Sequence, residues 1–384
     1  MVLTGLQMLF AVPWVVLLFT VPILLAKRVR ISGFSAPSTD EAPLVSIIVP
    51  ARNESVNISV CVASLLNSLY PKSEIIVVDD GSVDGTGDIV RILAEHANGR
   101  LRLVEGEPLP EGWLGKPWAC WQGYRQARGD LLLFTDADTR HDDTLLGHAV
   151  GALKQRHADL VSVMPHQVMG SFWERLILPH IFTILAMRYH DLSRVNRSRR
   201  PRDVIANGQF LLVTREAYEA VGGHEALRAE VVEDQRLAQW MVAKGRRIFI
   251  AHAHDLMDTR MYRSLRGIVE GWSKNLARGS RSAAPRWISP LVPWLIVVYL
   301  AAMWIAPPAT LLASLVTPLN GTLFGWSLAA TVLGLAFWLP IHLWNRVPIQ
   351  YALAYPFGAT AAAVLFIRSA VRGDRVEWKG RSYS

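Results

Sequence analysis

The chain has 384 residues, 51% of them hydrophobic, and a formal net charge of +8. This length allows one large globular domain with additional segments. Two cysteines, Cys61 and Cys120, are too few for a disulfide framework and are expected to be reduced cytosolic thiols. Nucleic-acid binding would suit a basic protein, but no aromatic-rich RNA-binding pattern or helix-turn-helix pattern supports it. We therefore attribute the charge, which lies near apolar segments, to attraction to anionic lipid.

Residues 1–30 are predicted to form an N-terminal transmembrane anchor. Leu6 to Ala26 carries no charge and is long enough to cross a bilayer, and Lys27-Arg28-Val29-Arg30 follows directly. No basic region precedes this segment and no small-residue cleavage site follows it, which favours a retained anchor over a signal peptide. The basic flank places the next domain in the cytoplasm. Residues 31–43, rich in Ser, Ala and Pro, are expected to be a linker.

Residues 44–258 alternate between apolar strands and helices, as expected of an α/β nucleotide-binding sheet. Strands are predicted at Val45–Pro50, from Glu74 into an Asp-Asp-Gly-Ser turn, and at Leu101–Val104, with helices over Glu54–Leu69 and Gly85–Ala97. Neither a G-x-G-x-x-G fingerprint nor a P-loop lysine motif is present, which disfavours a dehydrogenase or an ATPase. A nucleotide site built from carboxylates remains.

Two strand ends carry such carboxylates. A buried strand from Leu131 runs into Asp136 and Asp138, and ligands of α/β sheets bind at the carboxyl ends of strands. An Asp-x-Asp there can hold a divalent cation, which in turn holds a diphosphate, although acidic residues also cap helices. Asp79 and Asp80 can accept hydrogen bonds from a base or ribose, or simply form a turn.

Four motifs occur in a particular order along the chain. They are Val-Pro-Ala-Arg-Asn-Glu at 49–54, Val-Val-Asp-Asp-Gly-Ser at 77–82, Thr-Asp-Ala-Asp at 135–138 and Val-Glu-Asp-Gln at 232–235. Together they resemble the family 2 glycosyltransferases, which have the GT-A fold and use nucleotide-activated sugars. The resemblance covers about residues 43–275. Gly-Trp-Leu-Gly-Lys-Pro-Trp-Ala at 112–119 further resembles the membrane-anchored branch with hopene-associated and carotenoid glycosyltransferases, which is related to ceramide glucosyltransferase.

This resemblance implies a nucleotide-sugar site and a cation. The residues that would form the site are Pro50, Arg52, Glu54, Asp79, Asp80, Lys116, Asp136, Gly208, Gln209 and Trp272. Lys116 would approach the diphosphate, for which a compact ammonium is suited. Asp136 and Asp138 would hold Mg²⁺ or Mn²⁺, since both ions accept oxygen ligands.

The resemblance also implies the catalytic base. It is Asp234, next to Glu233, and adjacent carboxylates can raise one another's pKa toward neutrality. The pair would also suit the start of a helix over Gln235–Ala243, because the helix dipole favours acids there. In-line attack by the acceptor would invert the anomeric configuration.

One element departs from the family pattern. Processive members and ceramide glucosyltransferase carry Gln/Arg-x-x-Arg-Trp after the base, whereas this chain has Ile-Val-Glu-Gly-Trp at 268–272. Trp272 is retained without the paired Gln and Arg, which disfavours a processive synthase and ceramide as the acceptor. His252 and His254 lie on one face of a predicted strand and are expected to be structural, with metal ligation as the alternative.

Three segments are predicted to face a membrane or the substrate. Residues 259–287 have a basic amphipathic pattern at helical spacing, which suits an anionic interface. Phe172 to Met187, interrupted by Pro179, is either a second interfacial helix or a core helix. The arginine-rich segment Ser193–Arg202 is expected to be a mobile loop that could close over the diphosphate.

Residues 288–371 contain about three predicted spans, roughly Ile288–Ala306, Leu323–Trp344 and Ile349–Ile367. Three spans would place the tail, residues 372–384, outside the cell, yet its basic residues indicate an internal position. One segment is therefore expected to be re-entrant or interfacial.

The sequence thus predicts an α/β protein with a GT-A-type nucleotide-binding mixed sheet flanked by helices, and with transmembrane α-helices at both ends. The expected function is an inverting, metal-dependent glycosyltransferase, multi-pass in the inner (plasma) membrane with a cytoplasmic catalytic domain. It would move one sugar from a nucleotide-sugar donor to a lipid acceptor, such as a hopanoid, a carotenoid or another polyprenyl alcohol. A processive polysaccharide synthase and a catalytically silent lipid-binding protein are the alternatives, and a silent protein has no need for intact carboxylates at Asp80, Asp136, Asp138 and Asp234.

Overall fold

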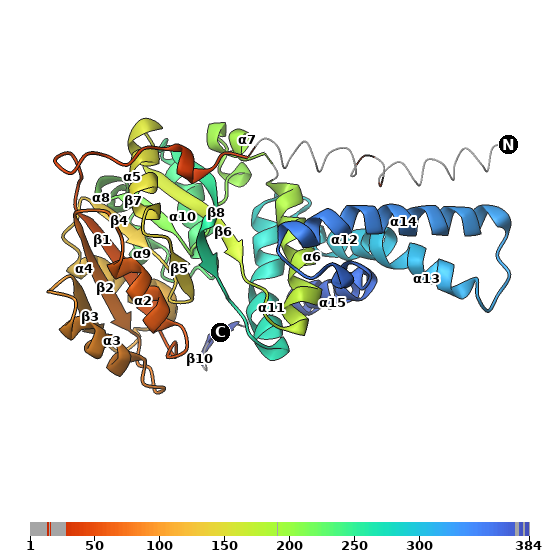
Figure 1. Cartoon of the computed structure of the whole chain (residues 1–384), viewed down its shortest axis with the longest axis horizontal. Coiled ribbons are helices and arrows are strands. Elements are labelled where there is room, and N and C mark those ends of the chain that lie inside the picture. Colours follow the sequence, from red (N-terminus) through yellow and green to blue (C-terminus); the bar gives the residue numbers. More distant parts are fainter. Residues whose placement is uncertain are drawn as a thin grey trace.

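The computed structural model describes Trp14, Val16, residues 28–189 and residues 191–372, together with the backbone of 376–378 and 381–383. Apart from Trp14 and Val16, the anchor predicted at Leu6–Ala26 lies outside the described residues, and so does most of the basic tail. An α/β unit occupies one end of the molecule and long apolar helices the other (Figure 1). Helices α6 (Phe172–Arg188) and α11 (Leu265–Ser282) lie between the two parts.

An eight-stranded mixed sheet forms the centre of the α/β unit, with the order β3-β2-β1-β4-β7-β6-β8-β5. The strands are β1 (Val45–Ala51), β2 (Ser73–Asp79), β3 (Leu101–Glu105), β4 (Leu131–Phe134), β5 (Thr139–His141), β6 (Leu160–Gln167), β7 (Leu211–Thr214) and β8 (Ile248–Thr259). Strands β3, β2, β1 and β4 are parallel neighbours, so their carboxyl ends share one edge. Strand β7 is antiparallel to both β4 and β6, which makes the sheet mixed as expected.

Helices connect and cover these strands. They are α2 (Ile58–Leu66), α3 (Thr86–Glu95), α4 (Gly115–Gln126), α5 (Leu145–Gln155), α7 (Leu192–Arg197), α8 (Arg215–Ala220), α9 (Gly223–Ala226) and α10 (Glu233–Ala243). The strands and helices expected between residues 45 and 104 are present with shifted ends. The prediction of a loop over Ser193–Arg202 was wrong, because α7 and a 3-10 turn at Pro201–Asp203 occupy much of it. Asp191 caps α7, and Leu192 and Val195 are buried, which orders the segment.

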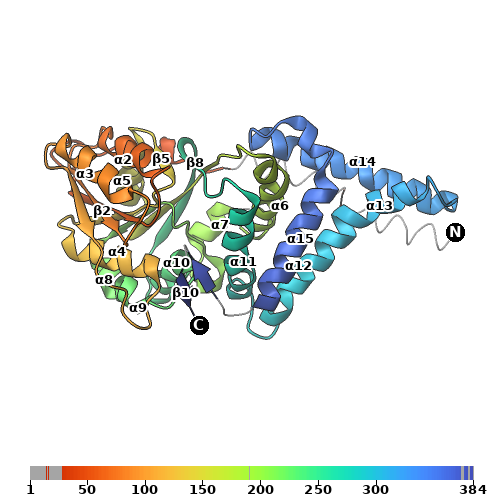
Figure 2. The ribbon, with the colours of Figure 1, turned by 90° about the horizontal axis from the view of Figure 1, so that it is seen from below.

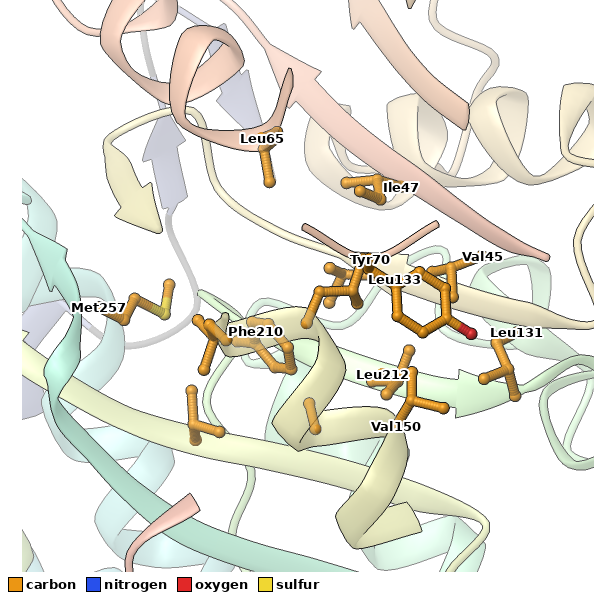
Figure 3. Packing of buried hydrophobic residues seen from close by; sticks show 14 of the residues in the cluster. Val45, Ile47, Leu65, Tyr70, Leu131, Leu133, Val150, Phe210, Leu212 and Met257 are labelled. Carbon is orange, nitrogen blue, oxygen red and sulfur yellow. The ribbon is translucent and has the colours of Figure 1, made fainter. Parts of the chain in front are cut away.

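Apolar side chains from several strands pack together with those of helix α5 against the sheet. Val45 and Ile47 of β1, Leu133 of β4 and Leu212 of β7 converge with Val150 of α5 (Figure 3). Burying one such side chain stabilises the fold by about 1.5–3 kcal/mol. This core gives the loops at the carboxyl edge a rigid support.

Two helical segments among the described residues have the length and composition of a membrane span. Ser289–Ala313 has 25 residues and a mean hydropathy of 2.0, and Gly321–Trp344 (α14) has 24 residues and a mean hydropathy of 1.6. The first combines a 3-10 turn η3 (Ser289–Leu291), α12 (Val292–Leu300), a π-helical turn η4 (Ala301–Ile305) and α13 (Ala306–Ala313).

The third predicted span, Ile349–Ile367, differs from this pattern. It consists of a 3-10 turn η5 (Ile349–Ala352) and part of α15 (Tyr355–Arg372), which does not meet the same criteria. Small buried residues such as Ala359 and Ala362 let α15 pack closely against α6, α11 and α12. Figure 2 shows α11, α15 and α12 side by side.

Helices α6 and α11 join the two parts of the molecule. Ser171 and Glu174 form a capping box that starts α6, and Ser264 caps α11. Helix α6 buries Leu176 to Ile181 but exposes Phe172, Trp173, Leu185 and Met187, so it has features of both a core helix and an interfacial helix. The predicted amphipathic helix is α11, which buries Ile268, Trp272 and Leu276.

Candidate active site

The carboxyl ends of β1, β2 and β4 bring the first three motifs together. Strand β4 ends at Phe134, and the following turn is fixed by two hydroxyl groups. Thr135 donates to the backbone oxygen of Gln209 at 2.7 Å, and Thr139 donates to that of Asp136 at 2.7 Å. The Asp-x-Asp turn is therefore held in place before any ligand binds.

On the β1 and β2 side, Arg52 crosses between the two loops. Its guanidinium donates to the backbone oxygens of Asp80 and Gly81 and lies 4.0 Å from the Asp80 carboxylate, which is 2% exposed. Asp79 accepts a hydrogen bond from the Ser82 amide at 3.0 Å. Asp79 and Asp80 thus shape the turn, and neither is among the residues that line the neighbouring cavity.

Lys116 connects two of the expected acidic residues. Its Nζ lies 2.7 Å from Asp136 Oδ1 and 2.8 Å from Glu233 Oε1. Burial alone would lower the pKa of Lys116, but these carboxylates hold it well above the usual value. The lysine stands at the start of α4, where Trp118 is nearly buried and donates from its indole to the Glu107 backbone oxygen at 3.1 Å. That packing gives Trp118 of α4 a structural role.

The Glu-Asp pair forms the first turn of α10, with each carboxylate in a different environment. Asp234 accepts hydrogen bonds from the amides of Gly208 at 2.8 Å and Gln235 at 2.7 Å. Burial and the adjacent Glu233 nevertheless raise the pKa of Asp234 to about 6. Burial would also raise the pKa of Glu233, but Lys116 more than offsets this and the pKa is lowered. Glu233 is therefore ionised at neutral pH, whereas the pKa of Asp234 is raised to about 6.

Gly208 permits the close approach of these groups. A Cβ atom at this position would lie 3.1 Å from Lys116 Nζ and 3.2 Å from Asp234 Oδ2, which is tighter than ordinary contact. Because Gly208 has no side chain, its amide can reach the Asp234 carboxylate while Lys116 packs against its Cα atom.

Asp138 is positioned by a chain of polar side chains. Its carboxylate accepts a hydrogen bond from Thr259 Oγ1 at 3.4 Å. Gln209, 3% exposed, donates to that hydroxyl at 3.0 Å and accepts from Gln167 at 3.1 Å. Gln209 therefore acts as a support for Thr259 and Asp138, although it also lines the cavity.

A cavity of about 1430 Å³ connects these groups to the apolar helices. The expected site residues on its wall are Pro50, Arg52, Glu54, Lys116, Asp136, Asp138, Gly208, Gln209, Glu233, Asp234 and Trp272. The apolar part of the wall includes Phe182, Leu185, Val292, Ile296, Phe337 and Ile341 from α6, α12 and α14. Arginines at 188, 194, 200 and 202 lie along the same cavity. One continuous space thus has a charged end and an apolar end.

Comparison with known proteins identifies relatives of the segment that forms most of the sheet and its loops. Residues 46–222 match the family model described as Glycosyl transferase family 2. We call this matched segment the family 2 domain. The matched segment contains the Asp-x-Asp turn, Lys116 and Gly208, whereas Glu233 and Asp234 lie just beyond it. The family resemblance expected from the ordered motifs is confirmed.

Curated relatives of the family 2 domain include 4,4'-diaponeurosporenoate glycosyltransferases of Staphylococcus aureus. The proteins of strains MRSA252 and USA300 are each 27% identical over 258 residues, which cover 65% of this chain and 65% of each relative. The match thus spans slightly under two thirds of the relatives' own length. The expected resemblance to the carotenoid branch is confirmed.

A solved structure confirms the expected GT-A fold. The mannosyltransferase PcManGT from Pyrobaculum calidifontis, in complex with GDP-Man and Mn²⁺, superposes with a TM-score of 0.61 and 23% identity. The superposition covers 96% of this chain and 98% of that one, so it includes the apolar helices as well as the family 2 domain.

The oxygen ligands of the family 2 domain fit a cation that takes further ligands from its substrate. Over residues 28–189 and 191–372, no three His, Cys, Asp or Glu side chains are grouped to hold an ion. Asp136 and Asp138 supply carboxylate oxygens only, and Mg²⁺ commonly binds one or two carboxylates with the remaining ligands from phosphates and water.

The two histidines of β8 have structural contacts. The His254 ring lies 4.6 Å from that of His166 and 4.7 Å from that of Trp344, and Arg28 lies 3.8 Å over Trp344. Burial and neighbouring cations lower the pKa of His252 and of His254 to about 4. The ring contacts agree with the structural role expected for His254.

Three residues near the carboxylates escaped the sequence analysis. Gln167 and Thr259 are cross-strand partners at the ends of β6 and β8, after a bulge between Pro165 and His166. Their pairing joins segments more than 90 residues apart, so no local pattern marks it. Tyr262 follows β8 and also lines the cavity, and its aromatic character among basic residues was the only signal.

Proposed function

We propose that this protein is a membrane-bound, inverting glycosyltransferase that moves one sugar from a nucleotide-sugar donor to a lipid acceptor at the cytoplasmic face. The observation that carries the proposal is the cavity, which connects Lys116, Asp136 and Asp234 to the apolar side chains of α6, α12 and α14. A polar donor would occupy the charged end and an acceptor chain the apolar end. A soluble acceptor would not need the second region.

The carboxylate arrangement supports the chemistry. Asp234 would accept the proton of the acceptor hydroxyl as that oxygen attacks the anomeric carbon, and the bond from this carbon to the diphosphate oxygen would break. Because attack and departure occur on opposite faces, the configuration inverts. The pKa of about 6 leaves Asp234 mostly ionised at neutral pH and still basic enough to take a proton.

Lys116 and the Asp-x-Asp turn would bind the departing diphosphate. Asp136 and Asp138 would hold Mg²⁺ or Mn²⁺, which when bound neutralises charge on the leaving group. A complex of GDP-Man and Mn²⁺ in a protein of the same fold supports this assignment. Lys116 would then exchange part of its contact with Asp136 for contact with phosphate oxygens.

The names of the curated relatives support a carotenoid-type lipid as the acceptor. Two apolar helical segments, Ser289–Ala313 and α14, would anchor the chain as a multi-pass protein of the inner (plasma) membrane. Helix α15 would be the interfacial segment, because it packs on α6 and α11 next to the cavity. An even number of spans after the catalytic domain would return the basic tail to the cytoplasm.

The proposed function is tested with detergent-purified protein, a panel of nucleotide sugars and a polyprenyl or carotenoid lipid. Release of the nucleoside diphosphate is measured with and without Mn²⁺, and the radiolabelled product is extracted with organic solvent. We expect lipid-dependent release from one donor and a product of a single added sugar. A labelled polymer would indicate the processive alternative, and no release from any donor would contradict the proposal.

One double variant and one control test whether Asp136 and Asp138 hold the cation. The double variant Asp136→Ala, Asp138→Ala is expected to lose the stimulation by Mn²⁺ together with the activity. Asp130→Asn is the matched control, because this exposed residue lies at the other end of β4. Turnover that survives the double substitution would contradict the cation assignment while leaving transferase activity in place.

A further inference from the structure

Tyr262 lies in a groove on α11 that two glycines create. Gly267 and Gly271 are four residues apart and thus on one face of the helix. A Cβ atom at Gly267 would lie 3.7 Å from the Tyr262 ring, and one at Gly271 would overlap its hydroxyl end. The phenol therefore occupies the space that any larger side chain at position 271 would need.

The side chain of Tyr262 lines the same cavity as the carboxylates. Burial raises the pKa of this phenol, and Asp138 and Asp136 are close enough to raise it further. The indole of Trp272 lies 6.3 Å away between ring centroids and supports the ring from one side. Tyr262 thus lies on the wall of the cavity that Asp136 and Asp138 also line.

This arrangement concerns one position of the departure at residues 268–272. The residue before Trp272 is Gly271, and the side chain missing at that position is replaced in space by Tyr262 from the preceding loop. A phenol O–H adds a hydrogen-bond donor without adding a charge.

We propose that the Tyr262 hydroxyl donates a hydrogen bond to the diphosphate of the nucleotide-sugar donor, beside the Asp-x-Asp turn, and that Gly267 and Gly271 serve to seat it there. This proposal rests on the proposed transferase function. The diphosphate is the expected partner because it brings anionic oxygens to this end of the cavity, whereas the acceptor chain would lie among the apolar side chains. As the glycosidic bond breaks, negative charge grows on the leaving oxygen, so the hydrogen bond is stronger in the transition state and the product than in the bound donor.

Tyr262→Phe tests the hydroxyl alone, since the ring and its seat on α11 remain. A hydrogen bond to a charged group is worth on the order of tenfold or more in affinity. We expect kcat/KM for the donor to fall at least about tenfold, and UDP or GDP, whichever the wild type binds with Mn²⁺, to bind more weakly by a similar factor. The KM for the lipid acceptor and the midpoint of thermal unfolding should stay at their wild-type values.

Gly271→Ala provides a second, independent variant. Alanine favours a helix over glycine, so α11 itself should not be weakened, but the new methyl group would displace the phenol. We expect the same losses in kcat/KM and nucleoside diphosphate affinity as for Tyr262→Phe. Tyr351→Phe is the control, because Tyr351 is half-buried on η5 and does not line the cavity.

Unchanged donor kinetics and unchanged UDP or GDP affinity in Tyr262→Phe would overturn the assignment. A change confined to the KM of the lipid acceptor would overturn it as well. Both results require an active wild type, so they are distinct from failure of the proposed function, in which the wild type releases no nucleoside diphosphate from any donor.

Discussion

Glu233 and Asp234 are adjacent on the first turn of α10, yet the pKa values of their carboxyl groups are displaced in opposite directions. The difference comes from Lys116, which touches Glu233 directly and Asp234 only at longer range. The two interpretations of the pair, as acids at a helix start and as part of a catalytic site, are therefore compatible. The helix start fixes the geometry, and the lysine makes the two groups unequal.

The pKa of Asp234 leads to a prediction about pH. The group works as a base only when ionised, so kcat/KM should fall about tenfold per pH unit below about pH 6 and level off above it. Asp234→Asn should lower kcat by roughly 10²–10⁴-fold at neutral pH. Initial rates from pH 4.5 to 8 measure both effects. Wild-type rates in Asp234→Asn would exclude this residue as the base.

Lys116 offers a second test with a defined sign. Its positive charge lowers the pKa of Asp234, so Lys116→Met should move the acidic limb of the kcat/KM profile to a higher pH and also weaken donor binding. Lys116→Arg is the matched control. Lys116→Arg keeps the positive charge, so the acidic limb of its kcat/KM profile should stay near that of the wild type. This should hold even if its maximal rate is lower. A limb that moves to lower pH in Lys116→Met would contradict the electrostatic account.

At the scale of residues, the site side chains that follow directly after strands could be predicted from the sequence. Asp136, Asp138 and Arg52 follow β4 and β1, and their meeting at one edge is a consequence of parallel strands. Asp79 and Asp80 follow the same rule but turn into the loop, because Ser82 and Arg52 engage them there. That outcome depends on side-chain contacts that no spacing encodes.

At the scale of elements, Arg260 links α6 to the Asp-x-Asp turn. Its guanidinium bonds both carboxylate oxygens of Glu174, at 3.0 and 2.9 Å, and its amide donates to the Asp138 backbone oxygen at 3.2 Å. Glu174 is fully buried and also caps α6. The pair therefore fixes the position of α6 relative to Asp136 and Asp138.

Removing this carboxylate should be costly. Glu174→Ala leaves Arg260 without its partner and α6 without its capping box, so we expect a loss of about 3 kcal/mol in stability. The midpoint of thermal unfolding in detergent measures it. Asp88→Ala, which removes an exposed ion pair with Arg91, should leave that midpoint almost unchanged. Equal midpoints for the two variants would show that the Glu174 pair contributes no more than a surface contact.

Strands and helices could be predicted where a local hydrophobic pattern marks them. They could not be predicted where tertiary packing determines the secondary structure. The strands at Val45 and Leu131 are continuous apolar runs, so they were recognised at once. The segment at Leu192 carries mostly arginines and polar residues, and only the burial of Leu192 and Val195 makes it a helix. The segment Ile349–Ile367 is divided between η5 and α15, and the alanine-rich face of α15 packs against α11.

At the scale of the whole molecule, the two candidate spans expose apolar side chains that a membrane would cover. Val298 on α12 is 62% exposed. Val298→Asp should reduce membrane insertion, because a charged side chain near the centre of a span costs roughly 2.5–3.5 kcal/mol. Sedimentation of membranes after alkaline extraction measures the effect.

Val83 provides the control for this experiment. It is 89% exposed on the turn after β2, within the α/β unit. Val83→Asp introduces the same charge and should leave membrane association unchanged. Equal extraction of both variants and the wild type would argue against α12 as a span.

The cavity has a wall that the family 2 domain does not supply. Helices α6 and α11 border it on one side and pack on α15 on the other, and α12 and α14 complete it. If these helices lie in a bilayer, lipid thickness and lateral pressure act directly on the shape of the acceptor space. The turnover measured in one lipid mixture would then be a property of the protein together with that mixture, and cells could alter it by changing their lipids alone.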